Sequence, residues 1–325
     1  MRKIINIFLA SSIVEFENER MAIENFIRNI SDKFEEHYDV KLQPLLCENF
    51  DDAVSKIRKQ EEYNKKIRNS ELCFFLFFTK VGQYTREEFD VARAKFLDTG
   101  KPKIYTYFKV ITDEKVEQGL YDFMNELDKT LGHYFGMFDH LDTVKLRILL
   151  SIKLQEMDFI EIKTDNGKCI VDGNAVMSLE NVSEFANNQI FNQLKLEFSE
   201  TEEKYFKLKA KYADDCSDEN TALEYAEIAT KRQNLIDSIE GLQKNIFNMS
   251  LRMCKDEIHG EITQRQKEAY RLFESGDIEG ANRILDFAEI KNEYQRKNMI
   301  RNAEKKEENN KNIEIHFLPK PNKSI

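Results

Sequence analysis

The sequence predicts a doubly wound α/β domain with a parallel sheet of five strands, followed by an all-α domain built on a helical hairpin. Two observations predict the first part. Up to about residue 157, short apolar runs alternate with segments of helical periodicity, and residues 72–78 are apolar at every position, as in a central parallel strand. A third observation predicts the second part, because beyond residue 182 apolar residues recur at spacings of three and four along two long segments.

The first half contains the five predicted strands. The apolar run 3–10 is the first strand, and the periodicity after it predicts a helix that ends near residue 34. The other expected strands are 40–46, 72–78, 103–110 and 134–138, and the other expected helices are 51–68, 85–98, 116–131 and 142–155. Thr85 and Glu88 have the spacing of a capping box at the start of helix 85–98. Ligands of parallel sheets bind beyond the carboxyl ends of the strands, so the loops after strands 3–10 and 72–78 are the expected binding region.

Three segments are predicted along the chain: an α/β domain at 1–157, a β-hairpin linker at 158–181 and a helical domain at 182–325. The turn residues Asp165-Asn166-Gly167 lie between two alternating stretches, which indicates the hairpin. Two heptad seams, 191–212 and 228–253, are separated by the polar stretch 214–220. We therefore expect two long antiparallel helices joined by a short turn.

A third helical region follows Gly260. Small and apolar residues around Gly276, from Ala269 to Ala288, have the intervals of a tetratricopeptide unit. One unit is fewer than the three or so that make a stable array, so a lone helix pair packed on the preceding hairpin is an equally good interpretation. Residues 291–312 are highly charged, and the last 13 are expected to form a loose tail.

Composition excludes several classes of function. The chain has 49 Lys and Arg against 59 Asp and Glu, a net charge of -10, so its field repels phosphate backbones and nucleic acid is not an expected partner. No stretch approaches the ~20 apolar residues of a membrane span, and acidic residues follow the apolar run 4–10 where a signal peptide needs a small, neutral cleavage region. No membrane partner is expected.

The cysteines and histidines suggest neither disulfides nor a metal site. The five cysteines lie far apart without CxxC spacing, and their odd number fits no closed disulfide framework, so we expect a cytoplasmic protein. Cys73, inside an apolar strand, is expected to be inert. The five histidines lack metal-ligand spacing, and the chain contains neither GxGxxG nor a P-loop, so no metal and no ATP are expected.

Two short motifs resemble the TIR family. Residues 78–92 are similar to that family's third strand, loop and helix, with a carboxylate, an apolar residue and then a small one in Glu88-Phe89-Asp90-Val91-Ala92. The opening, residues 7–12 followed by Glu19-Arg20, resembles TIR-like domains of bacterial defence proteins. The resemblance covers about the first 150 residues. It implies a TIR or flavodoxin-like fold and one of two roles, either cleavage of NAD+ or assembly as a scaffold.

For the enzymatic role, the resemblance implies Glu88 as the catalytic carboxylate. Nicotinamide leaves NAD+ as a neutral molecule, so no second carboxyl group is needed to protonate it, unlike in ordinary glycoside hydrolysis. A single carboxylate under the ribose would stabilise the positive charge of the transition state. The expected place of Glu88 in a first helical turn favours its ionised form. The alternatives are a capping residue or a solvated helix charge, and Glu87 competes for the catalytic role.

Six further residues complete the expected NAD+ site: Phe8, Ser11, Ser12, Arg20, Gly82 and Tyr84. The two serines are expected either to donate hydrogen bonds to ribose or phosphate or to start a helix. The arginine is expected to meet a phosphate or an acidic neighbour. The two aromatic side chains would stack on a ring of the dinucleotide, although the one in the first strand also suits the core. The glycine either lets the loop approach the ligand or makes a turn.

The leading hypothesis from the sequence is a TIR-like NAD+ hydrolase or cyclase of prokaryotic antiviral defence, with NAD+ as substrate and no cofactor. Its helical domain would sense a protein or small-molecule trigger, form a homo-oligomer, or both. The first alternative is a non-enzymatic scaffold. The second is a nucleoside deoxyribosyltransferase-like enzyme, because Glu87-Glu88, Ala92 and Gly100-Lys101-Pro102 also resemble that family. The long helical extension weighs against this last reading.

Overall fold

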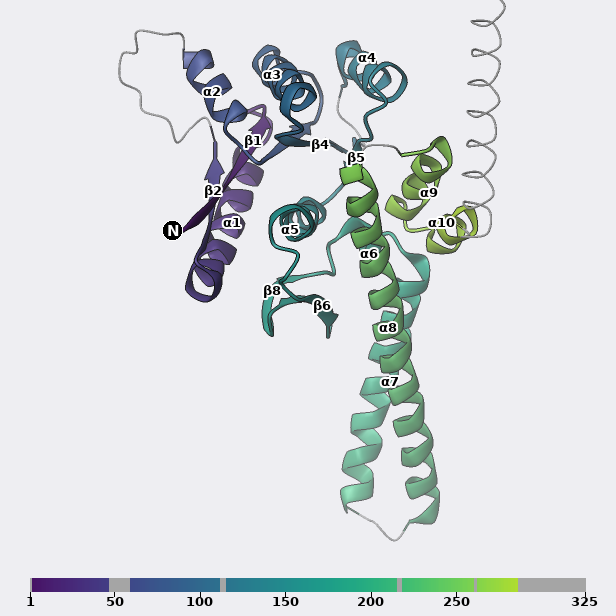
Figure 1. Ribbon diagram of the computed structural model, residues 1–325. Helices are drawn as coiled ribbons and strands as arrows, with labels where there is room; N and C mark the ends of the chain where they lie inside the picture. The colour runs from purple at the N-terminus through teal and green to yellow at the C-terminus, as the bar shows by residue number, and fades with distance from the viewer. Residues whose placement is uncertain (1, 47–58, 112–114, 215–217, 260–261, 286–325) are drawn as a thin grey trace, which may run out of the picture.

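The first half of the chain forms a five-stranded parallel sheet flanked by helices (Figure 1), as the sequence predicts. The computed structural model describes residues 2–46, 59–111, 115–214, 218–259 and 262–285. The strands are β1 (Lys3–Ser11), β2 (Val40–Leu45), β3 (Leu72–Phe77), β4 (Lys103–Lys109) and β5 (Gly136–Phe138). Their order is β2-β1-β3-β4-β5, which is the flavodoxin-like order of a doubly wound sheet.

Helices cover both faces of this sheet. One face carries α1 (Glu17–Tyr38) and α5 (Leu141–Glu156), and the other carries α2 (Lys59–Arg68), α3 (Gln83–Thr99) and α4 (Gln118–Asn125), which continues into a π-helical turn η2 (Glu126–Thr130). All six residues of β3 are buried. Coverage on both faces explains why this strand is apolar at every position, because neither side of it meets water.

The start of α3 differs from the prediction. The helix begins at Gln83, its N-cap is Gly82, and no side chain caps it. The expected capping box is therefore wrong. Thr85 and Glu88 lie within the helix and are only 5% and 6% exposed, so their side chains point into the interior and do not cap the free amides at the helix end. The first part of the predicted helix 51–68 lies outside the described residues.

The segment between the two halves is a three-stranded antiparallel sheet, which has one strand more than the predicted hairpin. It consists of β6 (Ile162–Asp165), β7 (Lys168–Val171) and β8 (Asn174–Ser178). The expected turn is confirmed, with Asn166 and Gly167 both at positive φ, as the type I′ hairpin turn requires. A second pair at positive φ, Asp172 and Gly173, turns the chain into the strand that was missed.

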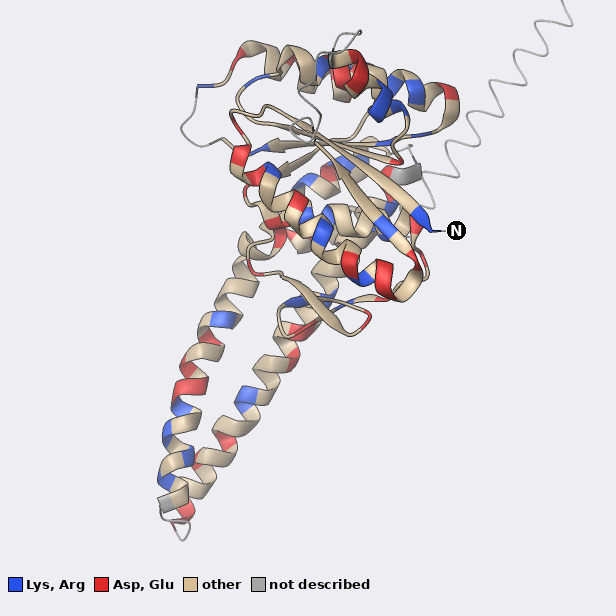
Figure 2. Cartoon of the chain, turned by 90° about the vertical axis from the view of Figure 1, so that its left-hand side faces the viewer, with Lys and Arg blue, Asp and Glu red and all other residues tan. Residues whose placement is uncertain are grey.

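The helical half projects from the sheet as an antiparallel hairpin (Figure 2), as the heptad seams predict. After the short α6 (Ser183–Ala186), the hairpin is made by α7 (Gln189–Asp214) and α8 (Glu219–His259). The expected helix pair around Gly276 is α9 (Gln264–Glu274) and α10 (Ile278–Ile284). Predictions for residues beyond 285 fall outside the described part of the chain. No described helix is long and apolar enough to cross a membrane.

The two halves share a core. Ile246 and Met253 of α8 and Phe273 of α9 belong to the same cluster of buried apolar side chains as Phe74 of β3. Helix α5 lies between the sheet and the hairpin and contacts α8. The base of the hairpin is therefore fixed to the sheet by hydrophobic packing, while its far end extends into solvent.

Candidate functional site

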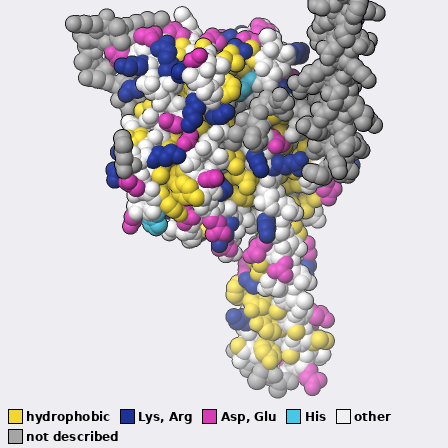
Figure 3. Space-filling model, viewed as in Figure 1, with side chains coloured by type: hydrophobic (Ala, Val, Ile, Leu, Met, Phe, Trp, Pro, Cys, Tyr) yellow, Lys and Arg dark blue, Asp and Glu magenta, His cyan; other side chains and the backbone are white. Residues whose placement is uncertain are grey.

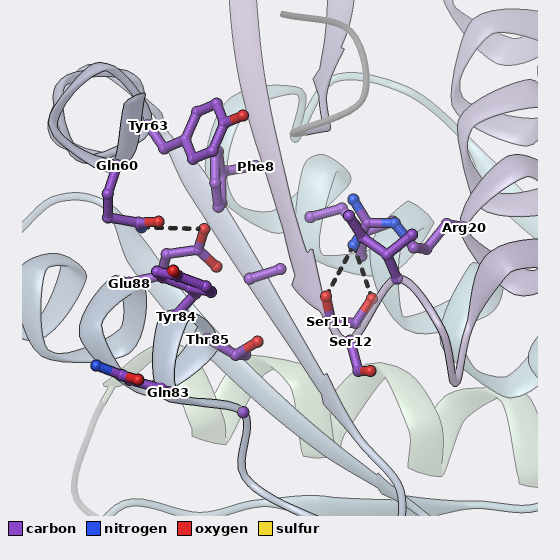
Figure 4. Close-up of a pocket in the computed structure, with 14 residues that line it drawn as sticks. Phe8, Ser11, Ser12, Arg20, Gln60, Tyr63, Gln83, Tyr84, Thr85 and Glu88 are labelled. Atoms are coloured by element: carbon purple, nitrogen blue, oxygen red, sulfur yellow. Dashed lines mark hydrogen bonds between the residues drawn. The ribbon is translucent and has the colours of Figure 1, made fainter. Parts of the chain in front are cut away.

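A cavity of about 450 Å³ opens at the carboxyl end of β1, between the start of α3 and helix α2 (Figure 4). This volume lies within the ~300–1,000 Å³ range of small-molecule sites. The cavity lies at the point where the chain reverses its winding direction between β1 and β3, which is where doubly wound sheets bind ligands. The structure brings all seven predicted site residues to its wall: Phe8, Ser11, Ser12, Arg20, Gly82, Tyr84 and Glu88.

Among the described residues, Glu88 is the one acidic residue in the cavity wall. Its side chain is 6% exposed, and its Oε1 atom lies 3.5 Å from Nε2 of Gln60, which donates from α2. Since α3 begins at Gln83, Glu88 is in the second turn of the helix. The stabilisation of its charge that was expected from a first-turn position is therefore wrong, because the helix dipole acts within the first turn. The side-chain amide of Gln60 remains as a hydrogen-bond donor to the Glu88 carboxylate.

Glu87 and Glu88 point in different directions, although they are adjacent. Asn64 of α2 donates a hydrogen bond of 3.0 Å to Oε1 of Glu87, which is not among the residues that line the cavity. Successive residues of a helix are rotated by about 100°, so only one of two neighbours faces a given site. The geometry favours Glu88 over Glu87 for contact with a ligand.

Helix α2 contributes wall residues that sequence reasoning missed. Gln60 and Tyr63 line the cavity beside Glu88 and Phe8 (Figure 4). A signal was present, because Gln60, Tyr63, Asn64 and Ile67 have the spacing of one helical face. Gln60 and Asn64, on that face, are only 5% and 3% exposed. Buried amides on the sheet-facing side of a helix need partners, and here the partners are the glutamates of α3.

Arg20 and Ser11 form a buried pair at the opposite wall. Arg20 is 1% exposed, and its Nη1 donates to the Ser11 Oγ at 2.8 Å and to the Ser11 carbonyl at 3.2 Å. The hydroxyl of Ser12 accepts from the backbone N–H of Glu15 at 3.4 Å, which is a local turn contact. This wall therefore presents a guanidinium group and two hydroxyl groups at the end of β1 (Figure 4).

The aromatic residues occupy two different positions. Phe8 is 1% exposed, so it belongs to the core and also lines the cavity. Tyr84 is 60% exposed at the mouth, one helical turn before Glu88. Gly82 has a φ of -64°, and an added Cβ would lie 3.6 Å from the Thr85 hydroxyl, an ordinary contact. Neither conformation nor space requires a glycine at residue 82.

The loops around the cavity are tied together by polar contacts. The carboxylate of Glu15 accepts from the Thr79 backbone N–H at 3.2 Å and from its hydroxyl, which joins the loop after β1 to the end of β3. Lys109, the last residue of β4, forms an ion pair of 2.8 Å with Glu19. These contacts connect the loop after β1 and the first turn of α1 to the carboxyl ends of β3 and β4.

Cys73 lies within the sheet behind the cavity. Burial raises the pKa of its thiol well above the ordinary value, and the nearby carboxylates of Glu88 and Glu71 raise it further. The thiol is therefore protonated and not nucleophilic. Over the part of the chain that the structure describes, no group of His, Cys, Asp and Glu side chains has the arrangement of a metal site.

The arrangement can bind a molecule that places a hydroxylated, electron-poor group against one carboxylate. Glu88 supplies a carboxyl group, the serines and Thr85 supply hydroxyl groups, and Tyr63 and Tyr84 supply ring faces. Comparison of the chain with protein-family models, curated proteins and solved structures gave no match.

Proposed function

We propose that this protein cleaves the bond between nicotinamide and ribose in NAD+, as a TIR-like hydrolase or cyclase of prokaryotic antiviral defence. The observation that carries the proposal is the position of Glu88, a nearly buried carboxylate in the wall of a cavity at the β1/β3 crossover. The sequence resemblance of residues 7–12 and 78–92 to TIR-like domains supports the same function.

Glu88 acts on the sugar and not on the leaving group. In NAD+ the nicotinamide ring carries a positive charge. It becomes neutral nicotinamide when it leaves, so the bond breaks without a general acid. Positive charge develops on the ribose as it does so, and the Glu88 carboxylate stabilises that charge electrostatically. Because this carboxylate lies in a largely buried wall, its effect on the charge is stronger than in water. Water or a nucleophile from the substrate itself then attacks the sugar.

The other wall residues bind and orient the dinucleotide. Tyr84, at the mouth, stacks on a ring, while Ser11 and Ser12 donate to hydroxyl or phosphate oxygens. Arg20 holds the end of β1 through Ser11 and contributes positive charge on the side opposite Glu88. The expected role of each is binding, so its loss raises KM more than it lowers kcat.

Self-association is part of this proposal. The heptad seams of α7 and α8 pack on each other within one chain, so copies must meet through other surfaces. Hydrophobic side chains gather on the side of the hairpin seen in Figure 3. Two hairpin residues with large exposed apolar side chains are Phe206 of α7 and Leu223 of α8, which are 56% and 63% exposed. Exposed apolar patches of this kind mark contact sites in soluble proteins.

The experiment that tests the proposed function supplies two substrates separately to the purified chain. Release of nicotinamide from NAD+, followed by chromatography, supports the proposal and identifies linear or cyclic ADP-ribose. Exchange of the base of a deoxynucleoside with an added free base, without NAD+ cleavage, replaces it by a deoxyribosyltransferase-like function. If neither reaction occurs over a wide range of protein concentration, the scaffold interpretation takes its place.

A further inference from the structure

A buried ion pair lies between the sheet and the helical half, far from the cavity described above. Arg147 of α5 and Glu184 of α6 are 1% and 0% exposed, and their side chains form a salt bridge. Arg147 also donates to the Ser250 carbonyl at 3.5 Å and contacts Sγ of Cys254 at 3.8 Å, both on α8. The guanidinium group thus joins three helices in the interior.

Two further carboxyl groups enter the same region. Glu274, the last residue of α9, is 8% exposed and accepts from the backbone N–H of Met137 at 3.4 Å. This contact covers the edge strand β5. A Cβ atom at Gly136 would lie 3.0 Å from Oε1 of Glu274 and 2.8 Å from the Tyr107 ring, so the glycine makes room for the carboxyl group. The second group is Glu257 of α8, which lines a small cavity beside Tyr105, Tyr107 and Tyr134.

Among the described residues, more carboxyl groups than cations act on this region. Glu184 pairs with Arg147, and Glu257 and Glu274 are close enough for the charge of Arg147 to lower their pKa. Of the described side chains, one oxygen of Glu184 and one of Glu257 are buried without a hydrogen-bond partner. Three ionised carboxylates beside one guanidinium would leave excess buried charge, which is costly in a medium of low polarity. Protonation of two carboxyl groups removes this excess.

Titratable and charged groups from several packed elements lie around Glu257 and Glu274. Helix α5 contributes Arg147, α6 contributes Glu184, and α8 contributes Cys254 and Asp256. The sheet contributes the phenols of Tyr105 and Tyr107, and the chain before β5 contributes His133 and Tyr134. Burial lowers the pKa of His133 to about 4, and Lys267 of α9 lowers it further. Asp256 is engaged by the hydroxyl of Tyr270 and by Gln266 of α9. Burial raises the pKa of Glu257 to about 7 and that of Glu274 to about 8, while Arg147 lowers both.

We propose that Glu257 and Glu274 form a proton-dependent latch that holds α9 against α8 and the sheet when both carboxyl groups are protonated and releases α9 when both ionise. The basis is the cluster of three carboxyl groups near one arginine, together with the burial of Glu274 against the edge strand. The hydrogen bond from the Met137 N–H lowers the pKa of Glu274, but burial raises it by more. Ionisation leaves the net charge of this interior near -2, and opening α9 hydrates the carboxylates. The latch does not depend on the proposed cleavage of NAD+.

The direction of the effect follows from the raised pKa values. Both groups have a folded pKa above the ordinary value of 4.5. The stability they contribute is therefore complete below pH ~4.5, decreases as the pH rises, and is lost above the folded pKa values of about 7 and 8. One pKa unit corresponds to a tenfold change in an equilibrium constant. Between pH 6 and pH 9 the opening constant of α9 should rise by ~10-fold or more.

The test measures backbone hydrogen exchange in α9 at several pH values, corrected for the intrinsic exchange rate. In the wild type, the opening constant should rise from pH 6 to pH 9. The double variant Glu257→Gln with Glu274→Gln keeps the shape of both side chains and cannot ionise, so its opening constant should stay constant. Glu268→Gln, an exposed position of the same helix, is the matched control and should behave as wild type.

Two results would overturn the latch. One is a wild-type opening constant of α9 that does not change between pH 6 and pH 9. The other is a double variant that shows the same rise as wild type. If the double variant does not fold, Glu274→Gln alone is measured, because Glu274 has the higher pKa and its loss should remove most of the rise. An unchanged rise in that single variant also contradicts the proposal.

Discussion

At the scale of single residues, the candidate site depends on how one carboxylate is oriented. Gln60 donates to Glu88, while Asn64, one turn later, donates to Glu87. The two amides therefore hold two adjacent glutamates, of which Glu88 faces the cavity. The proposed function makes Gln60 a positioning residue, because its hydrogen bond orients Glu88.

Gln60→Leu should lower kcat for NAD+ cleavage by about tenfold, because loss of a hydrogen bond to a charged group costs ~1.5–3 kcal/mol and this bond is long. Asn64→Leu is the matched control on the same helical face and should change kcat much less. Steady-state kinetics and melting curves of both variants provide the comparison. Equal losses of kcat in the two variants would assign Gln60 a purely structural role.

The sequence predicts residues of this site when they follow strands. Ser11, Ser12 and Gly82 were expected because parallel strands present their carboxyl ends at one edge, and Phe8 was expected from its strand. Gln60 and Tyr63 were missed because their helix has a polar sequence, in which a buried amide looks like a solvated one. Their spacing places them on one helical face, but that this face is buried depends on the contact between α2 and α3, which the sequence of α2 alone does not show.

At the scale of elements, turns decide where the prediction was right and where it was wrong. The heptad seams gave the hairpin of α7 and α8, since apolar spacing depends little on distant contacts. The start of α3 was placed too late, because the capping-box spacing of Thr85 and Glu88 was taken for a helix end. Asp172-Gly173 is the same kind of turn signal as Asn166-Gly167, and it explains the third strand of the small sheet.

The turn between α9 and α10 gives a prediction of its own. Gly276 has a φ of +89°, and an added Cβ would lie 2.4 Å from the Asn187 carbonyl oxygen. Gly276→Ala should lower the free energy of unfolding by at least ~1–3 kcal/mol, from backbone strain together with this clash. Gly241→Ala, in α8 with no atom near the new Cβ, should raise the free energy of unfolding by ~0.5–1 kcal/mol. Urea denaturation of both variants would contradict the argument if Gly276→Ala were neutral.

At the scale of the whole molecule, one core joins the α/β sheet to the helical half. The sequence divides at residue 157 by its periodicity, yet buried residues of α8 and α9 pack in the same cluster as those of β3 and α5. Periodicity reports each element separately, so it does not reveal that two segments share an interior. Because the interior is continuous, a displacement of the helical half would be transmitted to the sheet.

If self-association completes the active site, activity per molecule should rise with protein concentration. Light scattering should show larger species over the same range in which the specific rate of NAD+ cleavage increases. Phe206→Ser with Leu223→Ser, at exposed positions of the hairpin, should shift both curves to higher concentration without changing the melting temperature. If the specific rate stayed constant over a concentration range in which the oligomeric state changes, catalysis would not depend on self-association.

The central claim, that Glu88 is the catalytic carboxylate, is tested most directly by comparing Glu88→Gln with Glu87→Gln. Glutamine keeps the size of the side chain and removes its charge, so both variants should melt near the wild-type temperature. Glu88→Gln should lower kcat for nicotinamide release by ~100-fold or more, as loss of an electrostatic stabiliser does. Glu87→Gln should retain most of the activity, because its side chain is turned toward Asn64. Wild-type turnover by a folded Glu88→Gln variant would contradict the account.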